Sequence, residues 1–290
     1  MKFIHLTDPH LVPPGERIYG LDPEARLRSA IADINKTQGD AAFVLVTGDL
    51  THRGKPAAYA LLRRALGELV IPCHLLLGNH DDRGAFRDAF PEVATDEHGF
   101  VQSVVETPAG PLLLLDTNQP GTASGWFCER RLAWLDRTLG AAKGQRAMLA
   151  MHHPPFDVAL PALDAIGLVQ KAELGAVLAR HAVRHIFFGH VHRPIHGTWR
   201  NIPFSTLRAL NHQVALQFEP DVSGDGRRRI LGSHEPAAYS IVLIDHDSII
   251  IHVHDFLDAS PRFYLSDEAQ RARTTGELEG RLVIGPAVES

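Results

Sequence analysis

Five short motifs along the chain carry side chains that commonly bind metal ions. In order they read LTDPH, VTGDL, LGNHD, MHHPP and FGHVH, and each follows an apolar run. Their carboxylate, amide and imidazole residues are Asp8, His10, Asp49, Asn79, His80, His152, His190 and His192. Such groups bind metals that accept mixed nitrogen and oxygen ligands, such as Zn, Mn, Fe or Co. Even without His80, the set exceeds the needs of one tetrahedral ion, so the pattern favours a two-metal hydrolase.

The segments that position these motifs alternate between strand-like and helix-like patterns. Apolar runs of strand length are Lys2–Leu6, Ala42–Val46, His74–Leu77, Leu112–Leu115, Ala147–Met151 and His185–Phe188. Helical periodicity covers Pro23–Asn35, Pro56–Leu69, Glu129–Leu139 and Lys171–His181. This alternation predicts an α/β fold. Because the motif residues come directly after strands, we expect them at the carboxyl ends of a sheet, where such folds bind ligands.

The chain changes character after residue 215. Glu219–Pro236 is polar and predicts an exposed loop or linker, whereas Tyr239–Ile244 and Ser248–His254 predict a β-hairpin. The last thirty residues predict no element. We therefore expect a catalytic core over residues 1–215 and a small extension over residues 216–290. The extension would complete the core, act as a lid or form an oligomer interface.

Composition excludes several classes of protein. A chain of 290 residues with 44% hydrophobic residues can bury one large core. Its net charge of −5 and pI of about 6.4 give no support for binding a nucleic acid polymer or an anionic membrane. No apolar run approaches the roughly 18 residues that a membrane span needs. Two cysteines, Cys73 and Cys128, make no disulfide framework, so a cytoplasmic location is the expectation.

The order and content of the motifs resemble the calcineurin-like metallophosphoesterase superfamily. Asp-x-His, Gly-Asp, Gly-Asn-His-Asp, an isolated His and Gly-His-x-His are all intact. The resemblance implies a four-layer α/β/β/α sandwich. It also implies that one ion is held by Asp8, His10, Asp49 and His192, and the other by Asp49, Asn79, His152 and His190. Asp49 would be shared by giving a separate oxygen to each cation, and His153 would only support the site.

A two-metal site of this kind would neutralise a phosphodiester. Two divalent ions carry four positive charges, while two aspartates and a bridging hydroxide remove three, which leaves about one. The hydroxide would attack phosphorus in line with the leaving alkoxide. Because Asn79 is uncharged, its ion should be the more weakly held.

Two further histidines are candidates for substrate contacts. His80, beside the ligand Asn79, could stabilise the transition state or protonate the leaving group, although a solvent-facing loop histidine is the alternative. By resemblance to glycerophosphodiesterases, His212 in STLRALNHQVAL would lie on the substrate side, with a plain surface histidine as the alternative. Asn79 would also contact substrate.

Features outside the metal motifs narrow the class. Ser/Thr protein phosphatases usually have an acid and a glutamate where this chain has His52 and Asp81. GERIYG, GNHDDRGAF, GTASGW and MHHPPF are more similar to bacterial bimetallic glycerophosphodiesterases and class III cyclic-nucleotide phosphodiesterases. The resemblance implies hydrolysis of small phosphodiesters, glycerophosphodiester-like first and 3′,5′-cyclic nucleotides second, by a homo-oligomer. A phosphomonoesterase, a nuclease and a non-catalytic interaction module are less favoured hypotheses.

Overall fold

The computed structural model describes residues 1–142, 145–224, 226, 228–262 and 265. Two compact units divide the chain, Met1–Leu257 and Asp258–Ser290. Every helix and strand given below belongs to the first unit. Most of the last thirty residues, for which the sequence predicts no element, lie outside the described part.

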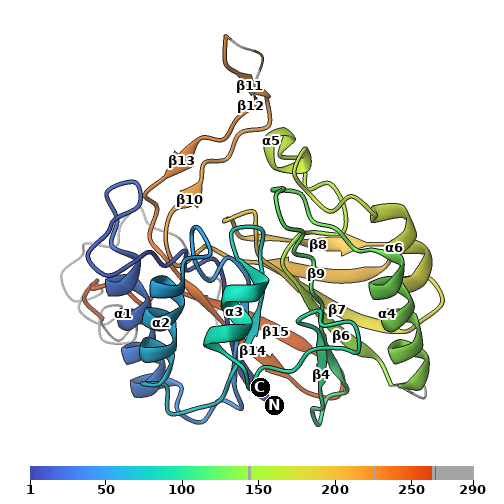
Figure 1. The fold of residues 1–290 in the computed structure, drawn as a ribbon. Coiled ribbons are helices and arrows are strands. Elements are labelled where there is room, and N and C mark those ends of the chain that lie inside the picture. Colours follow the sequence, from blue (N-terminus) through green and yellow to red (C-terminus); the bar gives the residue numbers. More distant parts are fainter. Residues whose placement is uncertain (143–144, 225, 227, 263–264, 266–290) are drawn as a thin grey trace, which may run out of the picture. The chain divides into compact units, whose positions relative to one another are not determined.

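The first sheet holds three of the motif-bearing strands. Its order is β15 (Ile249–His254), β14 (Tyr239–Ile244), β1 (Lys2–Leu6), β2 (Val44–Thr47) and β3 (Cys73–Leu76). Strands β1, β2 and β3 are parallel, whereas β14 runs antiparallel to both β1 and β15. The predicted hairpin is therefore present, and it joins this sheet beside the N-terminal strand (Figure 1).

The second sheet holds the other two motif-bearing strands. Its order is β4 (Ser103–Val105), β5 (Leu112–Leu114), β6 (Ala147–Met151), β7 (Val183–Phe188), β9 (Ile202–Thr206) and β8 (Ile195–Trp199). Strands β5, β6, β7 and β9 are parallel, and the edge strands β4 and β8 are antiparallel to their neighbours. The sequence did not predict β4, β8 or β9, because β8 is a polar edge strand and Pro203 interrupts the pattern of β9.

Helices cover the outer face of each sheet. Helices α1 (Pro23–Thr37), α2 (Pro56–Leu66) and α3 (Arg83–Ala89) share one apolar cluster with the first sheet, and α4 (Glu129–Ala141) and α6 (Lys171–Leu178) share another with the second. A third cluster joins the two sheets, with Phe3 and Leu45 from one and Leu114 and Phe187 from the other. The fold is thus the expected α/β/β/α sandwich (Figure 1).

Local chemistry explains where the first two helices begin and end. Asp22 accepts a hydrogen bond from the Ala25 amide at 3.0 Å, and Pro23 opens α1 as the sequence predicts. Helix α2 also begins at a proline, Pro56, but it ends at Leu66 before Gly67 rather than at Leu69. No described helix is long and apolar enough to cross a membrane.

The segment predicted as a plain loop forms an arm. Two short ribbons build it, β10 (Gln213–Val214) with β13 (Gly232–Ser233), and β11 (Asp221–Val222) with β12 (Arg228–Arg229). We call residues 213–234 the arm. It projects beyond the strand ends on the same side as the short helix α5 (Pro161–Asp164) (Figure 1). The loop prediction was wrong here because two-residue strands leave no periodic pattern.

Candidate metal centre and substrate cavity

The five motifs meet at one edge of the sandwich, although they lie far apart in the sequence. Each motif follows a parallel strand, namely β1, β2, β3, β6 or β7, and leaves it at its carboxyl end. All seven expected ligand residues come together there, and His80 lies beside them. This convergence is a property of the two-sheet topology, since no two of these strands are joined by a hairpin.

The first donor group combines two carboxylates and two imidazoles. Ligand atoms of Asp8, His10, Asp49 and His192 all lie within 4.8 Å of one another. His192 Nε2 is 3.2 Å from Asp8 Oδ1 and 3.1 Å from His10 Nε2, and all four residues are buried. Buried carboxylates and imidazoles at this spacing form a set that a divalent ion can satisfy.

A second donor group lies on the other side of Asp49. Asn79 Oδ1 is 3.2 Å from His152 Nε2 and 3.1 Å from His190 Nδ1. Asp49 Oδ2 is 3.4 Å from His152 Nε2 and 3.5 Å from His10 Nε2, so this one oxygen faces both groups. Asp49 Oδ1 instead accepts a hydrogen bond from the His80 amide at 2.9 Å. We expected a separate oxygen for each cation, whereas the geometry favours Oδ2 as the shared atom, because Oδ1 already accepts a backbone hydrogen bond.

Backbone conformation marks the same residues. Nine described residues other than glycine have positive φ, and five of them are Asp8, His10, Asp49, His190 and His192, with φ between 48° and 68°. Left-handed backbone costs on the order of 1–3 kcal/mol for such residues and persists only where the surroundings enforce it. Strained backbone of this kind is found mainly at functional sites. The geometry therefore indicates that the donor residues are in position before a ligand binds.

Two glycines give the loops the space they need. Gly48 has φ of +96°, and a Cβ there would lie 2.5 Å from His152 Nδ1. A Cβ on Gly189 would lie 2.9 Å from Asp8 Oδ2. Both positions therefore require glycine for close packing against the donor residues.

Outer hydrogen bonds orient the imidazoles. His152 Nδ1 is 2.8 Å from the Thr47 carbonyl, and His192 Nδ1 is 2.8 Å from the His212 carbonyl. Because a carbonyl can only accept, Nδ1 carries a proton in each ring, and Nε2 is the nitrogen that faces the cluster. His153 borders the cluster, with a nitrogen within 4.8 Å of His152 and His190, but its nitrogens already face Thr117 Oγ1 at 2.8 Å and the Ala123 carbonyl at 3.1 Å.

Two observations show that the residues fit metal ions. Within the described residues, Asp8 Oδ1 and His190 Nε2 are buried and make no hydrogen bond. Such atoms cost free energy unless something binds them. Burial works against ionised Asp49, yet His152 and His80 hold the pKa of its carboxyl well below its usual range. Likewise, despite burial, Asp49 raises the pKa of His152 to about 9, so the cluster attracts positive charge.

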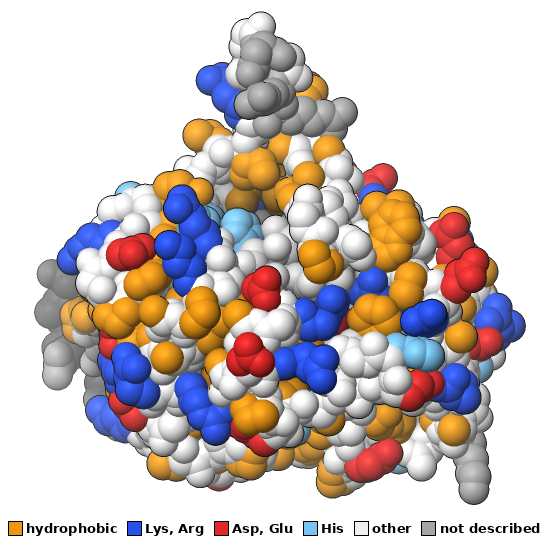
Figure 2. All heavy atoms as spheres, in the orientation of Figure 1, with side chains coloured by type: hydrophobic (Ala, Val, Ile, Leu, Met, Phe, Trp, Pro, Cys, Tyr) orange, Lys and Arg blue, Asp and Glu red, His pale blue; other side chains and the backbone are white. Residues whose placement is uncertain are grey.

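A cavity of about 600 Å³ opens over the donor groups. His10, Asp49, Asn79, His190 and His192 line its inner part, and His80 and His212 line it too. The His212 ring lies 4.5 Å from that of His192, between centroids, and lines the same cavity. Figure 2 shows histidine side chains below the base of the arm, between apolar surfaces.

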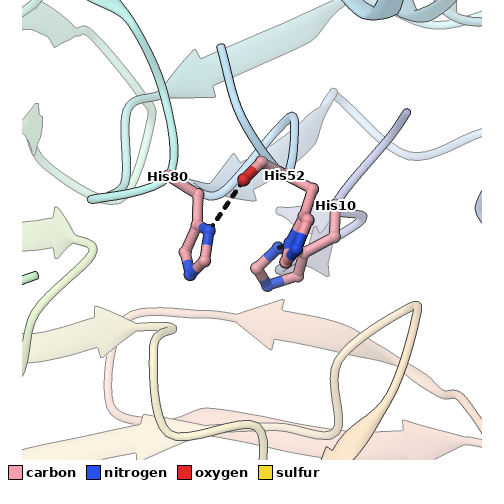
Figure 3. A group of neighbouring side chains, drawn as sticks. All are labelled: His10, His52 and His80. Carbon is pink, nitrogen blue, oxygen red and sulfur yellow. Dashed lines mark hydrogen bonds between the residues drawn. The ribbon is translucent and has the colours of Figure 1, made fainter. Parts of the chain in front are cut away.

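The sequence did not identify several cavity residues. Three are polar, namely Tyr19, His52 and His234, and four are aliphatic, namely Leu163, Ile166, Val214 and Ile230. His52 could have been found, because it replaces an acid in a recognisable motif. Its ring stacks on His80 with centroids 4.9 Å apart, and its carbonyl lies 2.9 Å from His80 Nδ1 (Figure 3). The aliphatic residues could not have been found from the sequence, because the arm and α5 are distant along the chain and come together only in the folded protein.

Comparison with known proteins agrees with this geometry. The family model for calcineurin-like phosphoesterases matches residues 1–194, so the chain belongs to that family. A probable cyclic nucleotide phosphodiesterase of Rhodopseudomonas palustris is 44% identical, covering 95% of this chain and 100% of that protein. The glycerophosphodiester phosphodiesterase GpdQ of Enterobacter lignolyticus is 30% identical, covering 74% and 79%. A dimetal phosphatase from Danio rerio shares the fold, with a TM-score of 0.64, 16% identity and coverage of 89% and 96%.

Proposed function

We propose that the protein is a metal-dependent phosphodiesterase that hydrolyses small phosphodiesters. The observation that carries this proposal is the pair of donor groups that share Asp49 Oδ2 at the floor of one cavity. We assign one ion to Asp8, His10, Asp49 and His192 and the other to Asp49, Asn79, His152 and His190. The ions would be Mn, Fe, Zn or Co, because nitrogen and oxygen donors are mixed.

The protein's residues divide the work of the reaction. A pair of bound ions supplies a hydroxide nucleophile at neutral pH and positive charge for the phosphoryl oxygens. The carbonyls of Thr47 and His212 hold the rings of His152 and His192 in their working orientation. Positioning of this kind is the main requirement for phosphoryl transfer.

His80 is the residue that we assign to the reacting phosphate. Its Nδ1–H donates to the His52 carbonyl, which leaves Nε2 facing the cavity, 4.0 Å from Asp49 Oδ2. A proton on Nε2 can be donated to a phosphoryl oxygen or to the departing alkoxide. His212 is assigned to a second substrate contact, because its ring lines the cavity beside His192.

The lining of the cavity favours small diesters as substrates. No Lys or Arg of the described chain lines it, so a nucleic acid polymer lacks its usual phosphate contacts. All expected ligands converge, which argues against a non-catalytic module. A glycerophosphodiester-like substrate stays first, and 3′,5′-cyclic nucleotides are the second candidate because a relative 44% identical is named for them.

One set of assays tests this function. Protein reconstituted with Mn, Co or Zn is compared on glycerophosphoethanolamine, cyclic AMP, a bis-aryl diester and an aryl monoester. We expect diester turnover that chelation abolishes; monoester turnover far above every diester would contradict the proposal. His80→Ala should reduce kcat by about 100-fold or more with metal content unchanged. Full turnover of this variant would remove His80 from the mechanism.

Two further expectations accompany this proposal. We infer a homo-oligomer in the cytoplasm, and exposed apolar side chains on the arm, Leu216, Phe218 and Val222, support self-association. Light scattering of the purified protein measures the mass directly. A monomer at micromolar concentration would contradict the oligomer, whereas cell fractionation checks the location.

A further inference from the structure

The cavity has an apolar wall in addition to its metal-facing floor. Leu163 belongs to α5, Ile166 follows it, Val214 lies in β10, and Ile230 lies between β12 and β13. We call these four residues the aliphatic wall. Leu163 and Val214 are buried, whereas Ile230 is 47% exposed and Ile166 is partly buried. Apolar area left open inside a cavity is the usual mark of an apolar ligand.

The base of the arm holds the wall in place. Arg193 donates to the Val214 carbonyl at 2.7 Å, and the Ala215 amide donates to the Leu231 carbonyl at 2.8 Å. Where the arm returns to the core, also at its base, His234 Nε2 lies 2.9 Å from the Tyr19 carbonyl. On the other side of Ile230, Arg229 pairs with Asp221 in the β11–β12 ribbon, so the chain is held at both neighbours of Ile230.

The charges around the cavity exclude charged organic groups. Asp49 is the only carboxylate among the described lining residues, and it belongs to the donor groups. An ammonium group would therefore find no anion of its own, and a second phosphate would find no Lys or Arg. Desolvating either charge without a partner is costly.

The remaining lining suits a flat group. Tyr19 and His212 meet edge to face with centroids 4.7 Å apart, and His52 and His80 stack at an interplanar angle of 18°. Ring faces and edges of this kind bind planar groups. A volume of about 600 Å³ also leaves room for a ring beside the phosphate.

We propose that the aliphatic wall makes this phosphodiesterase selective for diesters with an uncharged, flat, apolar organic group, such as an aryl or heteroaromatic ring. Ile230 and Ile166 are the specificity-determining residues, because they offer the open apolar surface. Diesters of a cationic alcohol, glycerophosphoethanolamine among them, are the poorer substrates, so the aliphatic wall reverses the order given above and places 3′,5′-cyclic nucleotides ahead of them. This inference depends on the proposed diesterase function and specifies the substrate class of the same cavity.

Three substrates with one leaving group test the inference. Phenyl, methyl and 2-aminoethyl p-nitrophenyl phosphates all release p-nitrophenolate, so they differ only in the retained group. With Mn-reconstituted protein, we expect kcat/KM for the phenyl ester to exceed that for the methyl ester at least tenfold, after correction for their rates in hydroxide. The 2-aminoethyl ester should be the poorest. A ratio of phenyl to methyl near one would overturn the inference.

Two serine variants assign the effect to the aliphatic wall. Ile230→Ser should lower the phenyl-to-methyl ratio at least threefold, and Ile166→Ser combined with Ile230→Ser at least tenfold. Leu231→Ser is the matched control, because Leu231 is 55% exposed, adjacent in sequence and absent from the lining. It should leave all three substrates unchanged. An unchanged ratio in Ile230→Ser refutes the wall, whereas no turnover of any ester by the wild type refutes the diesterase function itself.

Discussion

Replacing Asp81 should distinguish most clearly between residues that hold the metal site together and residues that take part in the reaction. Asp81 is buried and accepts hydrogen bonds from the amides of Leu50, Thr51 and Gly78, each at 3.0 Å. The hydroxyls of Thr51 and Tyr59 also donate to it, at 3.2 and 2.9 Å. Burial and the charge of Asp49 raise the pKa of Asp81 to about 6, so at neutral pH it is ionised and accepts all five. It therefore joins the loop of Asp49 to that of Asn79.

Asp81→Asn keeps the size of the side chain but removes half of its accepting capacity. The asparagine amide can take two orientations. In one, its amino group faces the N–H of Thr51; in the other, it faces the N–H groups of Leu50 and Gly78. Each unsatisfied donor costs about 1–3 kcal/mol, and the remaining bonds lose their charge, so we expect a loss of roughly 2–6 kcal/mol. This is a large part of a typical stability of about 5–15 kcal/mol.

Urea unfolding of the metal-free protein measures the effect, and metal titration measures its consequence. Affinity should fall by about 10–100-fold, as for other residues that support ligands. Asp82→Asn is the matched control, because Asp82 only caps α3 through the Ala85 amide at 2.8 Å, and asparagine caps equally well. The reasoning fails if Asp81→Asn unfolds within about 1 kcal/mol of the wild type.

Three other results are expected. Burial first, then neighbouring charge, lowers the pKa of His5 to about 3 and of His185 to about 4. The unfolded chain thus binds more protons than the folded protein below about pH 6.5. The free energy of unfolding should therefore fall toward pH 4, by about 1.4 kcal/mol per unit of pKa shift. His5→Asn should flatten the pH dependence of the urea midpoint. Chelation should remove the ion bound by Asn79 before the other, because Asn79 is uncharged, and Asn79→Asp should abolish this difference in a metal analysis. Simultaneous loss of both ions from the wild type would contradict the expected order. His212→Ala should lower kcat/KM about 10–100-fold with metals retained, since its carbonyl, not its ring, supports His192; loss of metal instead would make it structural.

Much of the fold could be predicted because its strongest elements have local patterns. Helix α1 begins where Asp22 and Pro23 indicate, and the motif-bearing strands are short apolar runs. The edge strand β8 and the arm could not be predicted, since their residues are polar or too few to show alternation. Their pairing depends on strands distant in the sequence, which no local pattern reports.

The sequence by itself determined the reaction class, because each donor residue lies within a short motif directly after a strand. For the adjacent His152 and His153, the sequence predicts that only one is a ligand, and the family resemblance assigns that role to His152. Only the tertiary structure decided that one oxygen of Asp49 faces both donor groups, since a backbone amide from another loop takes the second oxygen. It alone decided what surrounds the substrate, because α5 and the arm meet over the site through contacts that neither segment encodes alone.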